Sequence, residues 1–380
     1  MIRAHKIRLN PTPEQANYFA RAAGTARFCF NWGLAEWKKR YERGEKPNTR
    51  ALRAQFHAIR REQFPWTYDT TKCAVEGAFS DLGKAFNNFF EGRKKGRKVG
   101  YPVFKSKKKH RASFYIANDK FTVGSHWIEI PKLGRVNMAE CLRFRGKILG
   151  ARVTKVAAWW FVSIQVQLPD THPVNTNPPV GVDVGINRLA TLSDGREFEN
   201  QKPLRSAQKK LAHAQRALSR KKPGSRNREK AREQVARCHY EVSCIRNDVL
   251  HKLTTIVARK YGLVGIEDLH VKGLLRNHCL ALSLSDAALG RLLTLLENKV
   301  LATGGHVIQV DRYFPSSKRC SQCHTTNPDL ELSDRVFVCV NEACRYTADR
   351  DENAALNLVE EARRLWRETQ AVWRTGSEQT

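Results

Sequence analysis

The spacing of hydrophobic residues changes from alternating to helical near the beginning of the chain. Residues 2–9 alternate between apolar and polar side chains, which predicts a short strand. Thr12 followed by Pro13 is typical of a helix start, with the threonine as N-cap and the proline at the first helical position. Apolar residues then recur at helical spacing as far as Gly92, so residues 11–92 are predicted to form a helical segment with its aromatic residues in the core.

The pattern becomes strand-like in the middle of the chain. Residues 113–168 alternate in short runs between turn residues, which predicts an antiparallel β-barrel or sheet. The stretch 171–179, rich in proline and asparagine, is interpreted as a linker and as the main domain boundary. Beyond it, residues 180–186 and 261–266 are apolar on both faces, as expected of strands buried in the centre of a sheet.

Helices and one further strand are predicted in the second half. A basic helical segment over 201–232 is interrupted at Pro223 and Gly224, and helix then continues through Val257. The remaining predicted elements are an amphipathic helix over 284–301, a strand over 306–310, and a last helix from Asp351 to about Thr369 before a polar tail.

The chain carries a large excess of positive charge. Its 380 residues include 67 lysines and arginines against 37 acidic residues, a formal net charge of +30. Such an excess attracts a polyanion, so nucleic acid is the first candidate partner and an anionic membrane surface the second. The membrane alternative lacks support, because the longest apolar run, residues 156–168, is too short to cross a bilayer.

The beginning of the chain and the scattered cysteines indicate a cytoplasmic protein. The first residues contain no apolar signal-peptide core. Irregularly spaced cysteines in such a chain are more typical of reduced thiols than of disulfides. They are Cys29, Cys73, Cys141, Cys238, Cys244 and Cys279.

Four further cysteines have the spacing of a metal site. Cys320 and Cys323 form one short pair, and Cys339 and Cys344 form a second pair fifteen residues later. Two such pairs place four thiolates tetrahedrally around one Zn²⁺, at about 2.3 Å each; the alternative is cysteines without a metal. Because four thiolates fill the coordination shell and leave no position for water, the zinc is expected to be structural.

Three acidic residues indicate a second, catalytic metal site. Asp183 lies in a strand that is otherwise buried on both faces, where an ionised carboxylate costs several kcal/mol unless it is paired or metal-bound. Glu267 ends a second strand of this kind, and Asp351 stands in the first turn of the last helix. Acids on strands with another acid on a late helix describe an RNase H-like nuclease core, in which three carboxylates hold two Mg²⁺ ions about 4 Å apart.

Other acidic residues compete for these assignments. Asp349 is the alternative to Asp351, which is favoured because Asn353-Ala-Ala follows it at the helix start. Asp194 and Asp268 also follow strand-like runs and are interpreted as turn or capping residues.

Residues 93–111 form a basic stretch in which ten of nineteen residues are lysine or arginine and none is acidic. Interleaved aromatic residues allow such a stretch to pair with phosphates and to stack on bases, whereas the alternative is a solvated charged face. The candidate nucleic-acid contacts in it are Arg93, Lys94, Lys95, Arg97, Lys98, Tyr101, Phe104 and Lys105.

The motifs of the second half occur together in one known family. The chain contains Gly181-Val-Asp183-Val-Gly, Gly265-Ile-Glu267-Asp-Leu, Pro315-Ser-Ser-Lys-x-Cys320-Ser-x-Cys323 and Ala348-Asp-Arg-Asp351-x-Asn-Ala-Ala. In these residues it resembles TnpB, the RNA-guided DNA endonuclease family of bacterial insertion sequences and a relative of type V CRISPR effectors. Weaker matches lie in the first half, so the resemblance spans nearly the full chain.

The resemblance implies a multi-domain α+β and α/β fold, with Asp183, Glu267 and Asp351 as the catalytic, Mg²⁺-binding residues and the four cysteines as zinc ligands. A helical recognition segment is inserted in a β-barrel wedge domain, and a zinc ribbon is inserted in an RNase H-like (RuvC) nuclease domain. The implied domains are the wedge (1–10 and 93–172), the recognition segment (11–92), the nuclease domain (178–315 and 348–368), the ribbon (316–347) and a polar tail (369–380).

The second cysteine pair departs from the family pattern. Four residues separate Cys339 from Cys344, where two are commoner, and Arg345 follows where a glycine often stands. Tetrahedral ligation remains possible, but the loop around the metal must differ.

A family member of this kind carries a guide RNA derived from the transposon end and cuts double-stranded DNA that matches it. Base pairing reads the sequence, and the protein reads a short flanking motif and the heteroduplex backbone. The basic stretches 93–111 and 201–232 would contact the backbone. Lys72 and Glu76 would lie on the motif-reading surface, unless they are ordinary helix-surface charges.

The resemblance further implies a bacterial, nucleoid-associated protein that acts as a monomer in its RNA complex. Two alternatives stay open. One is a transposase that cuts its own transposon ends without RNA. The other is a nuclease-dead, RNA-guided repressor, although such proteins usually lose one of the acids and all three positions are filled here.

Overall fold

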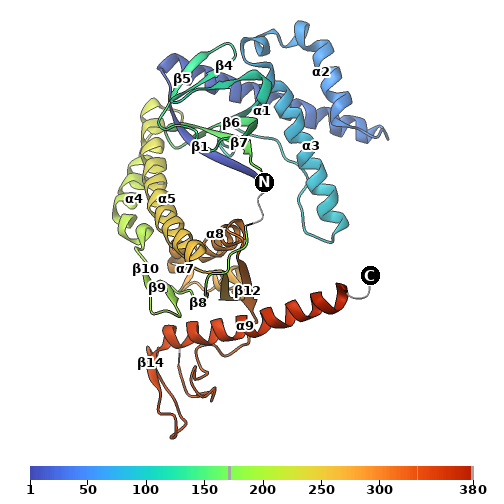
Figure 1. Ribbon diagram of the computed structural model, residues 1–380. Coiled ribbons are helices and arrows are strands. Elements are labelled where there is room, and N and C mark those ends of the chain that lie inside the picture. The colour runs from blue at the N-terminus through green and yellow to red at the C-terminus, as the bar shows by residue number, and fades with distance from the viewer. Residues whose placement is uncertain (170–172, 332, 378–380) are drawn as a thin grey trace. The chain divides into compact units, whose positions relative to one another are not determined.

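The computed structural model describes residues 1–169, 173–331 and 333–377, with side chains through residue 370. The chain divides into two compact units, Met1–Thr171 and His172–Thr380 (Figure 1). Both units combine helices with a β-sheet, which confirms the predicted mixture of helix and sheet. Within the described ranges, every helix is too short or too polar to span a bilayer.

The first unit contains a seven-stranded antiparallel sheet in the order β2-β6-β7-β1-β5-β4-β3. Its strands are β1 (Ile2–Asn10), β2 (Ser113–Ala117), β3 (Thr122–Val123), β4 (Trp127–Ile130), β5 (Gly134–Met138), β6 (Lys147–Val156) and β7 (Trp159–Gln167). Its helices are α1 (Pro13–Glu42), α2 (Thr49–Gln63), α3 (Lys72–Lys94) and the 3₁₀ helices η1 (Pro65–Asp69) and η2 (Asn118–Lys120). Closure of this sheet into a barrel stays a prediction.

The start of α1 follows the sequence prediction. The Thr12 hydroxyl accepts the backbone N–H of Gln15 at 3.3 Å, and the Gln15 side chain accepts the backbone N–H of Thr12 at 3.0 Å. This reciprocal capping satisfies two backbone donors that the helix itself leaves unpaired. One face of α1 then packs on the sheet through buried residues such as Phe19, while Leu34 belongs to a second core with α2 and α3.

The second unit contains a five-stranded sheet in the order β10-β9-β8-β11-β12, in which β8, β11 and β12 are parallel and β9 and β10 antiparallel. The strands of this unit are β8 (Pro179–Asp183), β9 (Arg188–Leu192), β10 (Glu197–Glu199), β11 (Leu263–Glu267), β12 (His306–Val310), β13 (Val336–Val338) and β14 (Thr347–Asp349). Its helices are α4 (Pro203–Ser219), α5 (Arg226–Lys260), α6 (Val271–Leu274), α7 (Ala281–Ala287), α8 (Leu289–Ala302) and α9 (Arg350–Ser377).

The two faces of this sheet are covered differently. On one face, apolar side chains such as Val182 and Ile266 pack against α5, α7 and α8. The other face is covered by α9, which packs against β8, β11 and β12 (Figure 1). Gly181 and Gly265 are paired in register beneath that helix. A Cβ atom would lie 1.9 Å from the Ala355 carbonyl oxygen at Gly181 and 2.5 Å from the Leu358 carbonyl oxygen at Gly265, so only glycine permits this approach.

The structure differs from the sequence prediction at two helices. The predicted helix over 284–301 is divided by Ala288, whose φ of 53° is left-handed. The cause is tertiary, because the buried Asp286 accepts the backbone N–H groups of Leu204 and Arg205 at the start of α4. The last helix is predicted to end near Thr369, but α9 continues to Ser377.

Replacement of Gly181 by alanine tests the contact between α9 and the sheet. The added methyl would overlap helix backbone rather than a flexible side chain, so we expect a loss of about 1–3 kcal/mol in stability. Thermal unfolding followed by calorimetry measures it. Gly290→Ala in α8 is the matched control, because its Cβ would meet Val271 at an ordinary 3.7 Å. Equal unfolding temperatures for Gly181→Ala and wild type would contradict the prediction.

Candidate active site

Two of the predicted catalytic acids lie side by side at one edge of the sheet. Val182 pairs with Ile266 across the parallel strands β8 and β11, and each strand ends at the next residue, Asp183 or Glu267. Because the carboxyl ends of parallel strands meet at the same edge of a sheet, the two acids emerge there together. Both residues are partly buried.

The third acid is delivered by the start of α9. The strand β14 ends at Asp349, whose carboxylate accepts the backbone N–H groups of Asp351 at 2.9 Å and Glu352 at 3.2 Å. Asp349 is therefore the N-cap of α9, and its lone pairs serve the helix start. Asp351, in the first turn, makes no such capping bond, which distinguishes the two aspartates that the sequence left in competition.

The carboxylates repel one another. Burial raises the pKa of Asp183 to about 7, and the negative charges of Asp351 and Glu267 act in the same direction. Burial also raises the pKa of Glu267, with Asp268 contributing. A cluster of partly buried acids with raised pKa values is typical of a site completed by cations.

The spacing of these acids differs from that of a single-ion site. In the described part of the chain, the four cysteines are the group of His, Cys, Asp or Glu side chains whose ligand atoms all lie within 4.8 Å of one another, and the three acids are more widely spread. Carboxylate oxygens are the ligands that Mg²⁺ prefers in proteins, so the chemistry of the three acids fits this ion.

Arg188, which sequence reasoning missed, links this site to the neighbouring strands. Its guanidinium lies 2.8 Å from Asp349, 3.1 Å from Glu197 on β10, and 4.0 Å from Asp351. Burial alone would raise the pKa of Asp349, but hydrogen bonds from Arg188 and from the helix start hold this pKa below its ordinary value. The only signal in the sequence was a charged residue opening an otherwise apolar strand.

A second arginine lies beside the same acid. Arg350, the first residue of α9, places its guanidinium 3.4 Å from the Asp351 carboxylate, and its side chain is only 15% exposed. Its positive charge opposes the rise in the pKa of Asp183. Two arginines thus partly balance the negative charge of these acids.

The other strand-end acids have structural partners. Asp194 accepts the backbone N–H of Arg196 within a turn and also the hydroxyl of Tyr261, and Asp268 pairs with Arg312. The contact with Arg196 agrees with the interpretation of Asp194 as a turn residue, whereas Asp268 is held by the Arg312 side chain.

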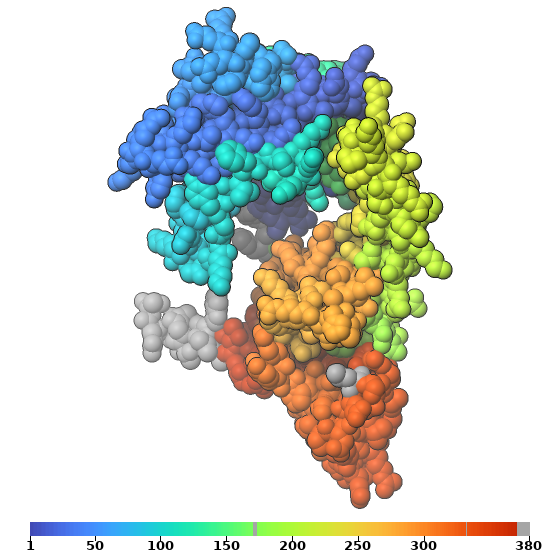
Figure 2. All heavy atoms as spheres, turned by 180° about the vertical axis from the view of Figure 1, so that it is seen from behind, coloured from blue at the N-terminus to red at the C-terminus, as the bar shows by residue number. Residues whose placement is uncertain are grey.

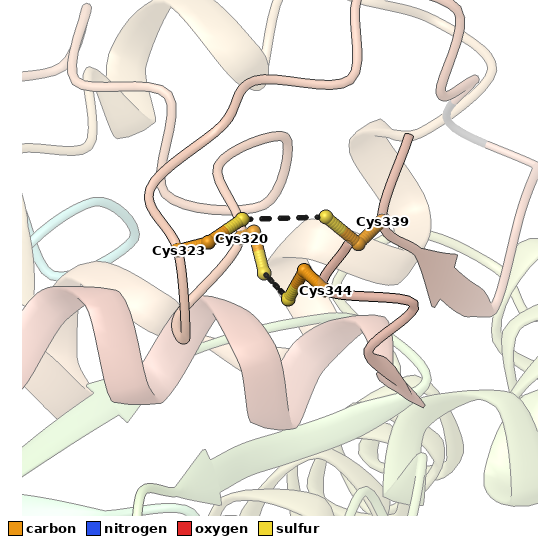
Figure 3. A group of neighbouring side chains, drawn as sticks. All are labelled: Cys320, Cys323, Cys339 and Cys344. Atoms are coloured by element: carbon orange, nitrogen blue, oxygen red, sulfur yellow. Dashed lines mark hydrogen bonds between the residues drawn. The ribbon is translucent and has the colours of Figure 1, made fainter. Parts of the chain in front are cut away.

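The four cysteine sulfurs converge as the spacing predicted (Figure 3). Cys320 and Cys344 lie 3.8 Å apart at sulfur, and Cys323 and Cys339 lie 3.5 Å apart. Zinc–sulfur bonds of about 2.3 Å in a tetrahedron separate the sulfurs by about 3.8 Å, so the group fits zinc. A small apolar core with Leu330, Phe337 and Tyr346 surrounds it.

Each cysteine pair is followed by a residue with left-handed backbone. His324 has a φ of 65° and Arg345 a φ of 49°. This conformation favours glycine, which explains why glycine is common at the Arg345 position. The arginine adopts it while its side chain donates a hydrogen bond to the Glu342 carbonyl, inside the lengthened second loop.

Two buried asparagines fasten the ribbon to α9. Asn353 accepts the backbone N–H of Ser321 at 3.0 Å and donates to the Arg319 carbonyl at 2.8 Å. Asn357 donates to the carbonyls of Ser316 and Arg319. Both side chains are fully buried, so α9 is bound to the sheet on one side and to the ribbon on another.

Most of the predicted nucleic-acid contacts lie on the surface of the first unit. The exposed ones are Lys72, Arg93, Lys94, Lys95, Arg97, Lys98, Tyr101 and Phe104. Lys105 differs, because its ammonium lies 3.7 Å from the ring centre of Phe30 and burial lowers its pKa. Tyr101 also packs edge-on against Phe86 and Phe89, although part of its ring remains open.

The chain is similar to curated proteins over nearly its whole length. A Streptomyces pristinaespiralis protein named “Putative RNA-guided DNA endonuclease” is 37% identical over 369 residues, which cover 94% of this chain and 88% of that protein. An Escherichia coli K12 protein, “Putative RNA-guided DNA endonuclease InsQ”, is 31% identical over 376 residues, covering 94% and 92%. A “TnpB-like protein” of Acanthamoeba polyphaga mimivirus is 24% identical over 200 residues, 49% of this chain and 38% of that one. The chain belongs to the TnpB family.

Family models match three parts of the chain, and a solved structure shares its fold. The models match as “Probable transposase” over residues 162–278, “Helix-turn-helix domain” over 1–46 and “Cas12f1-like, TNB domain” over 290–358, which contains the ribbon. Residues 1–46 of this TnpB-family chain fold as the strand β1 and the single long helix α1. A chain of the Cas12f1–sgRNA–target DNA complex has the same fold, with a TM-score of 0.57 at 14% identity over 92% of this chain and 83% of that one.

Removal of the Arg188 guanidinium is expected to loosen the start of α9. Arg188→Met leaves Asp349 with its helix contacts but without its cation, so amide hydrogens at the start of α9 should exchange about tenfold faster, equal to ~1.4 kcal/mol. Hydrogen exchange with mass spectrometry measures this. Arg196→Met is the matched control, since Arg196 is similarly exposed and pairs with Asp194 instead. Unchanged amide exchange at the start of α9 in Arg188→Met would contradict the role of Arg188 in holding this helix start.

The raised pKa of Asp183 predicts how stability depends on pH without Mg²⁺. The pKa of Asp183 is about 7 in the folded state, whereas its ordinary value is 3.8. Between pH 3.8 and about 7, the folded state therefore keeps a proton on Asp183 that the unfolded state has lost. Stability should therefore fall as the pH rises from about 4 to 7, and Mg²⁺ should restore it more at pH 8 than at pH 5. Unfolding temperatures measured with and without Mg²⁺ test this. In Asp183→Asn, both the fall in stability with rising pH and its restoration by Mg²⁺ should be lost. The same pH dependence in Asp183→Asn and wild type would contradict the prediction.

Proposed function

We propose that this chain is an RNA-guided DNA endonuclease encoded by a transposable element. The observation that carries the proposal is full-length similarity to relatives named as such endonucleases, combined with three acids gathered at the edge of one sheet. The shared fold with a protein solved in complex with guide RNA and target DNA supports it.

The nuclease domain is proposed to be RuvC-like, with Asp183, Glu267 and Asp351 as Mg²⁺ ligands. The sheet order β10-β9-β8-β11-β12, with α9 across one face, supports an RNase H-like core. Bound Mg²⁺ activates water and stabilises the leaving oxygen in phosphodiester hydrolysis. Within the protein, Asp183 must give up its proton as the site fills, because its pKa of about 7 leaves it half protonated at neutral pH.

The proposed partners of this chain are a guide RNA from the transposon end and a double-stranded DNA target. The helices α4 and α5 form a basic hairpin, and the side chains of α4 lie open in Figure 2, where this helix is yellow-green. This hairpin and residues 93–111 would contact the nucleic-acid backbone. The exposed Lys72, with Glu76 on the same helix, would face the flanking motif.

The finer domain assignments belong to the same proposal. The seven-stranded sheet would be the wedge, the helices α1 to α3 the recognition segment, and residues 316–347 the zinc ribbon inserted before α9. The ribbon would hold the start of α9, whereas the three carboxylates would bind the Mg²⁺ required for phosphodiester hydrolysis. A monomer in the RNA complex, in the bacterial cytoplasm and close to the nucleoid, accords with the net charge of +30.

The two alternative functions make different predictions. A nuclease-dead repressor is disfavoured because all three acids are present. A conventional transposase would cut its own transposon ends without RNA, and an end-cleavage assay with RNA-free protein distinguishes it.

Expression with the flanking locus, sequencing of the copurified RNA and a cleavage assay test the proposed function. We expect a discrete RNA from the element end and Mg²⁺-dependent cutting of DNA that matches it. Asp183→Asn should reduce cleavage by about 10³-fold or more while RNA and target binding persist, because it removes one metal ligand without changing shape. Asp194→Asn is the control, since that acid serves a turn. Absence of a discrete RNA would refute the guided-nuclease proposal, and undiminished cutting by Asp183→Asn would refute the metal site.

A further inference from the structure

Three residues of the basic stretch 93–111 line a cavity in the first unit. Its volume is about 210 Å³, and it lies where α1 and α3 meet the loop after α3 and the strands β2 and β6. Three alanines, Ala23, Ala26 and Ala78, line its apolar part. The charged or titratable side chains around it are Arg27, Asp81, Lys105, His110, Arg111 and Arg152, and we call this cavity the Arg111 pocket.

The loop wall of the pocket is held in place. The Asn31 side chain both donates to the Lys105 carbonyl at 2.8 Å and accepts the Lys105 backbone N–H at 2.7 Å. Further along the loop, the His110 ring accepts the Ser106 backbone N–H at 3.0 Å. These contacts fasten a chain segment without regular structure to α1 and to itself, so the pocket is formed before any ligand arrives.

The charges in the Arg111 pocket are unbalanced. Asp81 is its single carboxylate, and that carboxylate is engaged by Arg152 through two hydrogen bonds of 2.8 and 3.0 Å, with Lys105 at 4.0 Å. Within the described ranges, no hydrogen bond or ion pair engages the guanidinium of Arg27 or Arg111. Two cations thus face a cavity whose only anion is already paired.

The size and chemistry of the cavity select the ligand. Its volume of about 210 Å³ is that of a small site, which suits a phosphate group rather than a base pair. Guanidinium groups bind phosphate oxygens through paired, charge-assisted hydrogen bonds. The alanine lining offers the apolar contact that the face of a sugar requires.

We propose that the Arg111 pocket binds one phosphodiester of a nucleic-acid backbone. Arg27 and Arg111 donate to the phosphate, and the Arg152–Asp81 pair forms a fixed wall. The Lys105 ammonium stays against the Phe30 ring, so it attracts the phosphate by its charge without contacting it directly. The identity of the ligand as nucleic acid rests on the proposed function, whereas the anion site rests on the pocket itself.

The first experiment tests the anion site alone. Inorganic pyrophosphate should raise the unfolding temperature of the full-length protein, and Arg27→Gln/Arg111→Gln should remove most of that rise. The double variant should fold normally because neither guanidinium has a protein partner to lose; Arg111→Gln alone, at an exposed position, serves if it does not. Lys107→Gln/Lys108→Gln is the matched control, with the same loss of charge on the same loop but outside the pocket. Equal pyrophosphate responses in the two double variants would overturn the proposal.

The second experiment identifies the source of the phosphate. Anisotropy of a labelled 20-nucleotide RNA and a labelled 20-base-pair DNA is measured against protein concentration at several salt concentrations. The pocket variant should bind one or both about tenfold more weakly than the control variant, with a salt slope lower by about 0.7 to 0.9 per lost phosphate contact. A loss confined to RNA or to DNA names the source, and no loss beyond the control overturns the proposal. If wild type binds neither while pyrophosphate still acts through the pocket, the proposed function fails and the anion site stands.

Discussion

The close contact between α9 and the five-stranded sheet is the constraint on which the candidate active site depends. The helix backbone rests on Gly181 and Gly265, and a single Cβ atom at either position would collide with a helix carbonyl. Because Asp183 and Glu267 follow these glycines by two residues on the same strands, the depth at which α9 lies also sets how near Asp351 comes to them. The packing of α9 on the sheet therefore also determines the geometry of the candidate active site.

Electrostatics divides the acids around that contact into two groups. Asp349 is satisfied by the helix start and by Arg188, so its pKa is low and its charge is used within the protein. Among the described residues Asp183 has no such hydrogen-bond partner, and burial beside other carboxylates raises its pKa to about 7. The surroundings of the two aspartates thus differ: Asp349 organises the helix start, whereas the carboxylate of Asp183 is not used in this way.

Local chemistry made part of this structure predictable. The N-cap at Thr12 and the four-cysteine group follow from patterns of a few residues, and the structure contains both. The division of a predicted helix at Ala288 was not foreseeable, because Asp286 binds the start of a helix some eighty residues earlier in the chain. Hydrophobic spacing reports which face is buried, but not which distant backbone a side chain will meet.

The same limit applies to the site. The three acids could be named from their strands and helix, and the family resemblance strengthened the choice. Arg188 could not, because its partner at Asp349 lies 161 residues away and only folding joins them. The Arg111 pocket is an extreme case, since its charged residues come from four separate segments. The basic stretch was visible in the sequence, but the distinction between the internally held Lys105 and the unpaired Arg111 was not.

The asparagines that join the ribbon to α9 have a consequence for how the enzyme is made. Asp183 and Glu267 leave the ribosome well before Asp351, which is carried by the last helix. Asn353 and Asn357 join that helix to the backbone of the ribbon segment, which is also made after the two sheet strands. The start of α9 and the four-cysteine group are therefore coupled in folding: what orders the cysteines also helps to position the helix that carries Asp351.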